Sequence, residues 1–531
     1  MTENQSHYDA VVVGSGFGGS IAALRLAEAG RSVLVLERGR RYKPGEFPRD
    51  VTDVDRMFWR HPRRAKATGL FDVRMFSGIG VVAASGVGGG SLIYANIHIR
   101  PDPIVFDDPR WPASITRESL DPYYDKVASK LGVSPLPAHV DLPKRRLYRH
   151  AAETVGRPVF DPDQAVLWDV PGDGREAGSS DEAGPRGPCR LVAECEFGCQ
   201  FGAKNSMDLT YLAQAERLGT EVRTGVLASH VIPDDAGYAV AYHDVGTGLA
   251  GRVTGRQVVL SAGTLGTNDI LLRSRDVFST LPRLSPALGR GFSGNGDFLG
   301  SIQNSTADID PAHGPDVTSV IGYFDEEPGF TMAAPTFNAE VMKVLASSGQ
   351  AKLRWLRVLA PVLWPYLDEV IVWAFGKGLL SHPSRLPARG AGDYRRMTNL
   401  FAIGQDNANG RLCHRKGTLD VQWAYAEENR ALVDRMERAM GEVAKAYGGT
   451  YAALATWSLF RRIITVHPLG GCALSDSADG GVVSPHGEVH GYPGLFVMDG
   501  SVIPTSIGFH PVMTISAVAE RSAEAMAASF P

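Results

Sequence analysis

Glycines with the spacing of a phosphate-binding turn stand near the start of the chain. Gly14, Gly16 and Gly19 form a G-x-G-x-x-G pattern between an apolar run, residues 10–13, and an Ala- and Leu-rich stretch, residues 21–29. The first glycine permits a tight turn, the second lets the backbone approach a pyrophosphate, and the third lets a helix pack closely on a strand. The helix N-terminus offers free N–H groups and a favourable dipole to the anion. The pattern predicts a dinucleotide site.

An acidic residue stands where such a site requires one. Glu37 ends a second apolar run, residues 33–36, and lies 23 residues after Gly14. A carboxylate at the end of the second strand can accept hydrogen bonds from a ribose diol, and it disfavours the 2′-phosphate of NADP. Strand, turn, helix, strand and acid together predict a βαβ unit that binds a dinucleotide. The pattern alone does not separate NAD from FAD.

A second glycine-rich loop favours FAD. Residues 86–96 read GVGGGSLIYAN, with four glycines among the first five positions. Such a run does not fit the interior of a helix or strand, and it suits a backbone that passes tightly against a flat or phosphorylated ligand. FAD is long and contacts several segments of its protein, so two such loops favour FAD over NAD. The alternative, a flexible linker, is disfavoured by the apolar residues Leu92, Ile93 and Tyr94.

The elements that position these loops follow from apolar patterns and stop signals. They are expected as a buried strand at residues 258–260, amphipathic helices at 204–218 and 427–447, and a closing helix at 516–527. In the first of these helices, Leu209, Leu212 and Leu218 are expected to face inward.

Length and composition bound the class of protein. The chain has 531 residues, which predicts two domains or one domain with large insertions. Hydrophobic residues make up 44% and charged residues 21%, as in soluble globular proteins. The net charge of −4, with both signs dispersed, gives no reason to expect nucleic acid as a partner. The first residues, MTENQSHYDA, contain no basic or apolar signal region, so a cytoplasmic location is expected.

The most apolar stretch, residues 358–380, is not predicted to cross a membrane. Asp368 and Glu369 lie in its middle, and a spanning helix needs about 20 nearly uncharged residues. A buried pair of helices is the favoured interpretation. Its aromatic residues leave open peripheral contact with a membrane surface, or a place in the wall of an apolar substrate pocket.

Three of the five cysteines are close in sequence. Cys189, Cys195 and Cys199 form a C-x5-C-x3-C pattern. This spacing matches neither the usual zinc pair nor the ferredoxin run. Reduced thiols in a structured loop are therefore favoured over a metal or iron–sulfur cluster, and no metal is predicted.

Taken together, the motifs resemble those of the glucose–methanol–choline (GMC) oxidoreductases, and most closely those of the bacterial cholesterol (sterol) oxidase branch. They are GSGFGGS with Glu37, the GVGGGSLIYAN loop, VHPLGGC at residues 466–472 and DGSVIPTSIGFHPVMTISAVAER at residues 499–521. The resemblance implies an α/β fold: a Rossmann-like FAD-binding domain built from separated segments, with an inserted α+β substrate domain that contains a mixed sheet. The FAD-binding domain is predicted at residues 1–100, 195–300 and 456–531, and the substrate-binding domain at residues 101–194 and 301–455.

The resemblance also implies the site residues. The two catalytic positions fall on His467, as the base, and on His510, which orients the substrate; which of the two carries the proton stays open. FAD is expected to be non-covalent, because the histidine that some members use for attachment does not align with His98. The implied cofactor-binding residues are Gly14, Ser15, Gly16, Phe17, Gly18, Gly19, Glu37, Gly86, Gly90, Ser91, Tyr94, Ala95, Asn96, Ile97, Ala228, Asp499, Gly500, His510, Pro511 and Val512.

The implied activity is oxidation of a hydrophobic, sterol-like or other bulky alcohol. The hydroxyl proton goes to a histidine, which titrates near neutrality, and a hydride passes to flavin N5. The acceptor is O2 or, in a dehydrogenase, another molecule. A lyase, isomerase or photoenzyme, an NAD-linked dehydrogenase and a non-catalytic flavoprotein are the remaining alternatives. Two positions depart from the sterol branch, which usually has Asn at Tyr94 and at His510, and the accessory glutamate of that branch is not located.

Overall fold

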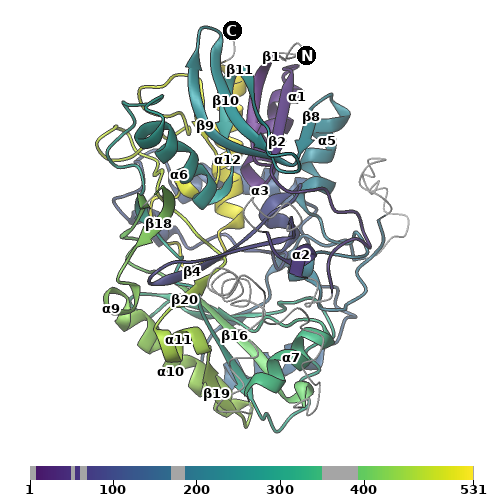
Figure 1. The fold of residues 1–531 in the computed structure, drawn as a ribbon. Coiled ribbons are helices and arrows are strands. Elements are labelled where there is room, and N and C mark those ends of the chain that lie inside the picture. Colours follow the sequence, from purple (N-terminus) through teal and green to yellow (C-terminus); the bar gives the residue numbers. More distant parts are fainter. Residues whose placement is uncertain are drawn as a thin grey trace, which may run out of the picture.

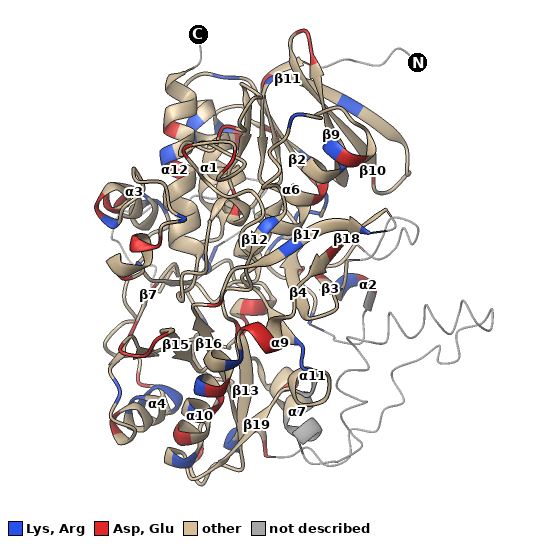
Figure 2. Ribbon diagram, turned by 90° about the vertical axis from the view of Figure 1, so that its left-hand side faces the viewer, with Lys and Arg blue, Asp and Glu red and all other residues tan. Residues whose placement is uncertain are grey.

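The computed structural model describes residues 7–49, 54–59, 68–168, 186–349, 393–415 and 417–529. The apolar stretch at residues 358–380 lies outside these ranges. Figure 1 shows two sheet-based halves, with both ends of the chain in the upper one. Figure 2 shows basic and acidic residues interspersed over both halves, in keeping with the small net charge.

The upper half is built on a seven-stranded sheet in the order β8-β2-β1-β11-β10-β9, with β21 paired to β11. All pairs among β8, β2, β1, β11 and β21 are parallel, whereas β9 and β10 form an antiparallel hairpin at one edge. The strands are β1 (His7–Val13), β2 (Val33–Glu37), β8 (Glu221–Thr224), β9 (Val226–Asp234), β10 (Gly237–Asp244), β11 (Ala250–Leu260) and β21 (Leu495–Val497).

Helices from distant parts of the sequence surround this sheet (Figure 1). They are α1 (Phe17–Glu28), α3 (Arg117–Lys130), α5 (Tyr211–Arg217), α6 (Gly263–Leu272) and α12 (Val512–Ala528). α1 and α6 contact the strands of the sheet, α5 and α12 pack on α1, and α3 packs on α12. The carboxylate of Glu520 on α12 is fully buried and accepts hydrogen bonds from Arg25 Nε and Nη2, each at 2.7 Å, and from the Tyr211 hydroxyl at 2.7 Å. The bidentate, charge-assisted contact joins α1 to α12, and the hydrogen bond from Tyr211 adds α5.

The lower half is built on a six-stranded antiparallel sheet in the order β19-β13-β16-β15-β14-β6. Its strands are β6 (Val159–Phe160), β13 (Phe298–Gln303), β14 (Val320–Tyr323), β15 (Phe330–Ala333), β16 (Thr398–Gly404) and β19 (Thr450–Ala453). α10 (Arg430–Ala446) covers one face, where Leu432 and Met436 pack against Gly404. α4 (Pro143–Thr154) is tied to the sheet by the Tyr148 hydroxyl, which donates to the Met332 carbonyl at 2.6 Å.

Two small sheets lie between the halves. One has the order β20-β4-β3 and the other β12-β17-β18. Their strands are β3 (Phe71–Met75), β4 (Ile79–Ala84), β12 (Arg290–Phe292), β17 (Gly410–Arg415), β18 (Thr418–Gln422) and β20 (Ile463–Thr465). The remaining named elements are α2 (Val54–Met57), β5 (Ile97–His98), β7 (Asp163–Gln164), α7 (Ala339–Gly349), α9 (Tyr425–Glu428), α11 (Ala455–Phe460) and the short turns of helix η1 (Gly89–Leu92), η2 (Pro103–Asp107), η3 (Cys195–Phe197), η4 (Met207–Leu209), η5 (Arg273–Val277), η7 (Tyr394–Arg396) and η8 (Gly500–Val502).

The expected βαβ unit and the strand at residues 258–260 are confirmed as β1, α1, β2 and the end of β11. The helix expected at residues 204–218 is wrong in its first third, because Lys204 turns its side chain toward backbone carbonyls and only η4 and α5 are helical. Leu218 is 50% exposed, since it follows the last helical turn. The helix expected at 427–447 is divided at Asn429, whose side-chain oxygen accepts the N–H of Asn407 at 2.8 Å.

The division into two domains stays a prediction. α3 comes from a part expected in the substrate-binding domain, but it packs against α12, and the Tyr124 hydroxyl lies 3.1 Å from Thr514 Oγ1. The closing helix begins at Val512 rather than at residue 516. Within the ranges that the structure describes, no helix has the length and apolar character needed to cross a membrane.

Gly18 offers a test of the packing between α1 and β21. A Cβ at Gly18 would lie 1.5 Å from the carbonyl oxygen of Met498, so Gly18→Ala forces backbone apart. We expect a loss of about 4 kcal/mol or more of stability, or no folded protein. The control is Gly441→Ala in α10, where a Cβ meets nothing within 4 Å; it should stabilise by up to about 1 kcal/mol. Thermal unfolding of both variants measures this, and a Gly18→Ala protein as stable as the native one would contradict it.

Candidate active site

The carboxylate of Glu37, which is predicted to bind a ribose, is hydrogen-bonded to the glycine-rich turn between β1 and α1. Glu37 is buried at the end of β2, and its carboxylate accepts the Ser15 N–H at 3.1 Å, the Ser15 hydroxyl at 2.7 Å and the Gly39 N–H at 2.8 Å. Gly14 has a φ of +96°, which a side chain would strain. The carboxylate therefore fixes the shape of the turn. Contact of Glu37 with a ribose stays a prediction.

The second glycine-rich loop lies directly against the first. The Gly88 N–H donates to Ser15 Oγ at 3.0 Å, and a Cβ at Gly89 would lie 2.6 Å from the Cα of Gly16. Farther along, the rings of Phe17 and Tyr94 make an edge-to-face contact at 5.5 Å between centroids. The structure thus brings together two loops that are separated by about seventy residues in the sequence and that were both predicted to contact the cofactor.

The side chain of Lys204 holds the second glycine-rich loop, residues 86–96, in place by hydrogen bonds; this contact is called the brace. Its buried ammonium donates to the carbonyls of Leu92 at 3.0 Å, Tyr94 at 2.7 Å and Cys195 at 2.7 Å. Burial lowers the pKa of Lys204 to about 8, partly offset by nearby acidic groups. Three carbonyls on one ammonium fix the backbone course of residues 92–94.

The third predicted segment, residues 499–500, joins the same centre. Asp499 is buried and accepts Thr267 Oγ1 at 2.5 Å and the Ser501 N–H at 2.9 Å. The Gly500 carbonyl accepts the N–H of Gly470 at 3.0 Å, which connects this segment to the HPLGG motif at residues 467–471. Ala228 is the third residue of β9. The start of β9 lies near the end of β2, since the N–H of Gly225, just before β9, donates to the carbonyl of Gly39, just after β2, at 3.3 Å. Of the remaining predicted residues, five lie in or directly after the second glycine-rich loop and two lie at the start of α12: Gly86, Gly90, Ser91, Ala95 and Ile97, and Pro511 and Val512.

The loop after η1 carries buried polar atoms that fit a flavin. Among the described residues, Asn96 Oδ1, both ring nitrogens of His98 and His510 Nδ1 are buried and have no hydrogen-bond partner. Burial lowers the pKa of His98 to about 3, so its ring is neutral. The polar edge of an isoalloxazine carries the donors and acceptors that such atoms need. The glycine-lined turn and these atoms together fit FAD. Binding of the pyrophosphate at the turn and of the flavin along residues 94–97 stays a prediction.

His467 and His510 lie together although 43 residues separate them. Their ring centroids are 5.4 Å apart and the ring planes are at 78°. Phe401 on β16 stacks on His467 with ring centroids 5.6 Å apart, and it makes a T-shaped contact with His510 at 6.3 Å between centroids. Burial holds the pKa of His510 well below its usual range. His510 is therefore neutral, so at its position the site offers an uncharged donor or acceptor.

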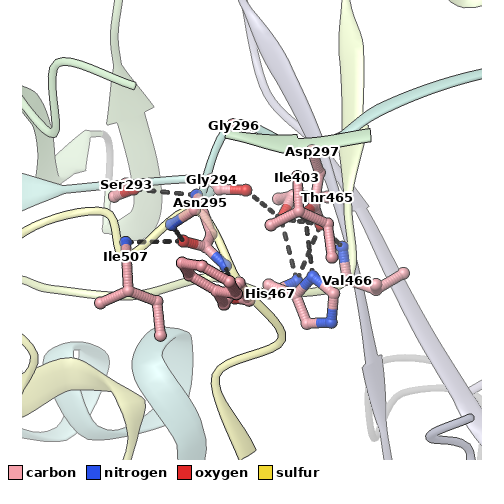
Figure 3. A network of polar contacts seen from close by, with 12 residues as sticks. Ser293, Gly294, Asn295, Gly296, Asp297, Ile403, Thr465, Val466, His467 and Ile507 are labelled. Carbon is pink, nitrogen blue, oxygen red and sulfur yellow. Dashed lines mark hydrogen bonds and ion pairs between the residues drawn. The ribbon is translucent and has the colours of Figure 1, made fainter. Parts of the chain in front are cut away.

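Residues 293–297, the SGNGD turn between β12 and β13, contact the segments that carry the two histidines, and Figure 3 shows this turn beside His467 and Ile507. Asn295 has a φ of +54°; its amide donates to the Phe509 carbonyl at 2.7 Å and its oxygen accepts the Ile507 N–H at 2.9 Å. Asp406 accepts the Ser293 hydroxyl at 2.7 Å and the N–H groups of Gly294, Gly296 and Ala408 at 2.9 to 3.0 Å. The SGNGD turn is thereby fixed to the segment that carries His510.

The side of the SGNGD turn next to His467 ends in a buried carboxylate. Asp297 Oδ1 lies 2.8 Å from His467 Nδ1, and Asp297 Oδ2 accepts the backbone N–H groups of Val466 at 2.8 Å and His467 at 3.2 Å. Thr465 Oγ1 lies 2.9 Å from the same oxygen. Figure 3 shows Asp297 above the imidazole, with its contacts converging on residues 465–467.

The three clustered cysteines lie beside Lys204. Burial raises the pKa of Cys189 to about 11, and burial also raises the pKa of Cys195 well above its usual range, so both thiols stay protonated. In the ranges that the structure describes, no group of three or more His, Cys, Asp or Glu side chains is arranged to hold a metal ion.

Family comparisons match most of the chain. A model of the amino-terminal part of GMC oxidoreductases matches residues 8–276, and one of the carboxyl-terminal part matches residues 408–519. The chain belongs to the GMC oxidoreductase family. It is therefore an FAD-dependent oxidoreductase that acts on CH–OH groups, and the predicted fold class is confirmed.

Relatives and solved structures agree with this assignment. A cholesterol oxidase of Mycobacterium tuberculosis is 31% identical, with 97% of this chain and 90% of that protein covered. A cholesterol oxidase of Acinetobacter baumannii is 29% identical, with 98% and 95% covered. The crystal structure of pyridoxine 4-oxidase from Mesorbium loti shares the fold at a TM-score of 0.62 and 18% identity, over 98% of this chain and 100% of that one.

Four residues of the site were not found by sequence reasoning: Lys204, Asn295, Asp297 and Asp406. The run SGNGD signals a turn, since it alternates glycine with polar residues. Nothing within that run indicates a histidine partner 170 residues later in the chain. Lys204 was assigned to a helix, where an exposed lysine is the ordinary expectation.

Lys204→Met tests the brace on the second loop. Methionine fills a similar volume but cannot donate, so three buried carbonyls lose their partner, at a cost of about 1–3 kcal/mol each. We expect weaker FAD retention and a lower melting temperature, measured from the ratio of flavin to protein absorbance and by thermal unfolding. Lys126→Met, at an exposed pair with Glu524, is the control and should change stability by less than about 0.5 kcal/mol. Equal FAD retention in both variants would disprove the brace.

Proposed function

We propose that this enzyme oxidises a hydrophobic, bulky alcohol of sterol-like size to the carbonyl, with His467 as the base, His510 orienting the substrate and O2 as the electron acceptor. The observation that carries the proposal is the pair of imidazoles at 5.4 Å beside a predicted flavin-binding loop, one of them held by a carboxylate. The substrate class and the acceptor are supported by relatives named cholesterol oxidase, which cover nearly the whole chain.

The two histidines have different roles toward the substrate hydroxyl. His467 accepts the hydroxyl proton, since its ring is close to His510 and has one nitrogen engaged by Asp297. His510 is neutral and buried, so it orients the oxygen by a hydrogen bond without competing for the proton. FAD, bound non-covalently, supplies the acceptor for the hydride of the carbinol carbon. Residues 14–19, Glu37 and the loop at 86–97 would hold it.

An aromatic surface beside the histidines supports an apolar substrate. Phe401 contacts both histidines from β16, and Asn399 on the same strand donates to the Pro335 carbonyl at 3.1 Å. Two residues farther, Phe337 contacts Phe197 at 5.8 Å between ring centroids. Aromatic rings bury large areas against a rigid apolar ligand. Phe337 and Phe401, which lie in the part of the chain predicted to bind substrate, suit a ring system better than a short polar alcohol.

The visible spectrum of the anaerobic protein tests the substrate and the acceptor. A 3β-hydroxysterol should bleach the flavin band near about 450 nm, and the colour should return when air is admitted. Bleaching without recovery in air would replace O2 by another acceptor. Flavin that no alcohol bleaches would overturn the proposed function.

His467→Ala tests the base. We expect the rate constant of flavin reduction by the alcohol to fall by about 10²–10⁴-fold, because proton removal loses its acceptor. FAD content should stay near that of the native enzyme, since the glycine-rich turn is intact. His313→Ala, at a half-exposed histidine paired with Asp310, is the control and should leave the rate unchanged. A His467→Ala rate within threefold of native would assign the proton elsewhere.

A further inference from the structure

We propose that Asp297 is a positioning residue that holds His467 in the tautomer with the proton on Nδ1, so that Nε2 is the atom that takes the substrate proton. This inference rests on the proposed function for the direction of proton transfer. The inference names the nitrogen of His467 that accepts the proton, and it names Asp297 as the residue that determines which nitrogen this is.

The contacts of Asp297 leave its carboxylate as an acceptor. The side chain is fully buried, and the backbone N–H groups of Val466 and His467 both point to Oδ2. These two N–H groups are fixed by the chain and cannot reverse their polarity. Oδ1 is the oxygen that faces the imidazole, at 2.8 Å from Nδ1. The Nδ1 atom is therefore the donor in this hydrogen bond.

A neutral imidazole carries one proton, so the tautomer decides which nitrogen can accept another. With the proton on Nδ1, Nε2 keeps its lone pair. Phe401 stacks on the ring and prevents it from turning freely. In the proton-transfer step the alcohol O–H bond breaks, the Nε2–H bond forms and the resulting imidazolium is paired with the Asp297 carboxylate; the carbinol hydride, with its electron pair, passes to FAD.

His510 has no equivalent partner. Among the described residues its buried Nδ1 has no hydrogen bond, and burial holds its pKa well below the usual range. In the part of the chain that the structure describes, no carboxylate is hydrogen-bonded to this ring to select its tautomer or stabilise its charged form. Of the two imidazoles, His467 is the one with a carboxylate beside its ring. We therefore assign the substrate proton to His467, a choice that the sequence left open.

Asp297→Asn tests the inference with little change in shape. The amide oxygen of asparagine can accept the two backbone N–H groups, and its NH2 group then faces Nδ1 as a donor. The imidazole must present a lone pair at Nδ1, so the proton moves to Nε2 and the base is blocked. We expect the rate constant of flavin reduction to fall by about 100-fold or more, with KM changed less than threefold and FAD content unchanged.

Asp269→Asn is the matched control. Asp269 Oδ1 also lies 2.7 Å from a histidine, Nε2 of His414, and this pair joins α6 to β17 outside the two-histidine site. The same chemical change there should leave flavin reduction within about twofold of native. An Asp297→Asn enzyme that reduces flavin within threefold of the native rate, while Asp269→Asn does the same, would overturn the positioning role.

A readout without turnover separates this inference from the proposed function. Nitrogen chemical shifts of ¹⁵N-histidine-labelled, FAD-loaded protein report which ring nitrogen carries the proton, and comparison with His467→Gln assigns the signals. The native protein should show His467 protonated on Nδ1, and Asp297→Asn should show it protonated on Nε2. A native signal protonated on Nε2 would disprove the inference even if Asp297→Asn failed to fold. If no alcohol reduced the flavin, the proposed function would fail while these shifts would still decide the tautomer.

Discussion

Backbone packs directly on backbone at the amino end of α1, and the rest of the enzyme is built around that contact. A Cβ at Gly18 would lie 1.5 Å from the Met498 carbonyl oxygen, and one at Gly89 would lie 2.6 Å from Gly16 Cα. These neighbours are main-chain atoms, which no rotamer change can move aside. The turn after β1, the second glycine-rich loop and the end of β21 therefore have a single arrangement. The N-terminus of α1 lies in this arrangement, and it is where the pyrophosphate is predicted to bind.

A second, polar network holds the two histidines that are proposed to act on the substrate. Asp406 fixes the SGNGD turn at residues 293–297, and Asn295 ties that turn to the segment that ends in His510. Asp297, at the end of the same turn, reaches the segment that carries His467. One five-residue turn thus spaces two imidazoles from different segments, which is the rigidity that acid–base chemistry requires. The network is buried, so each of its hydrogen bonds is made in a low dielectric.

Local patterns predicted the parts of the fold that short-range forces decide. The βαβ unit was read correctly because glycine sterics and apolar periodicity act within a few residues. The helix at residues 204–218 was wrong in its first third because Lys204 donates to three carbonyls, two of them in the distant second glycine-rich loop, and this tertiary gain outweighs helix propensity. The helix at 427–447 was divided at Asn429 for a similar reason, since its side chain accepts a backbone N–H of another segment.

By itself, the sequence determined the dinucleotide turn, the preference for FAD and, through resemblance, the two histidines and the family. Tertiary structure alone decided that these histidines meet at 5.4 Å and that one of them has a carboxylate partner. The physical reason is the distance along the chain over which each interaction acts. Turn and helix signals are carried by neighbouring residues, whereas the partner of His467 lies 170 residues away and reaches it only when β13 and β20 are brought side by side.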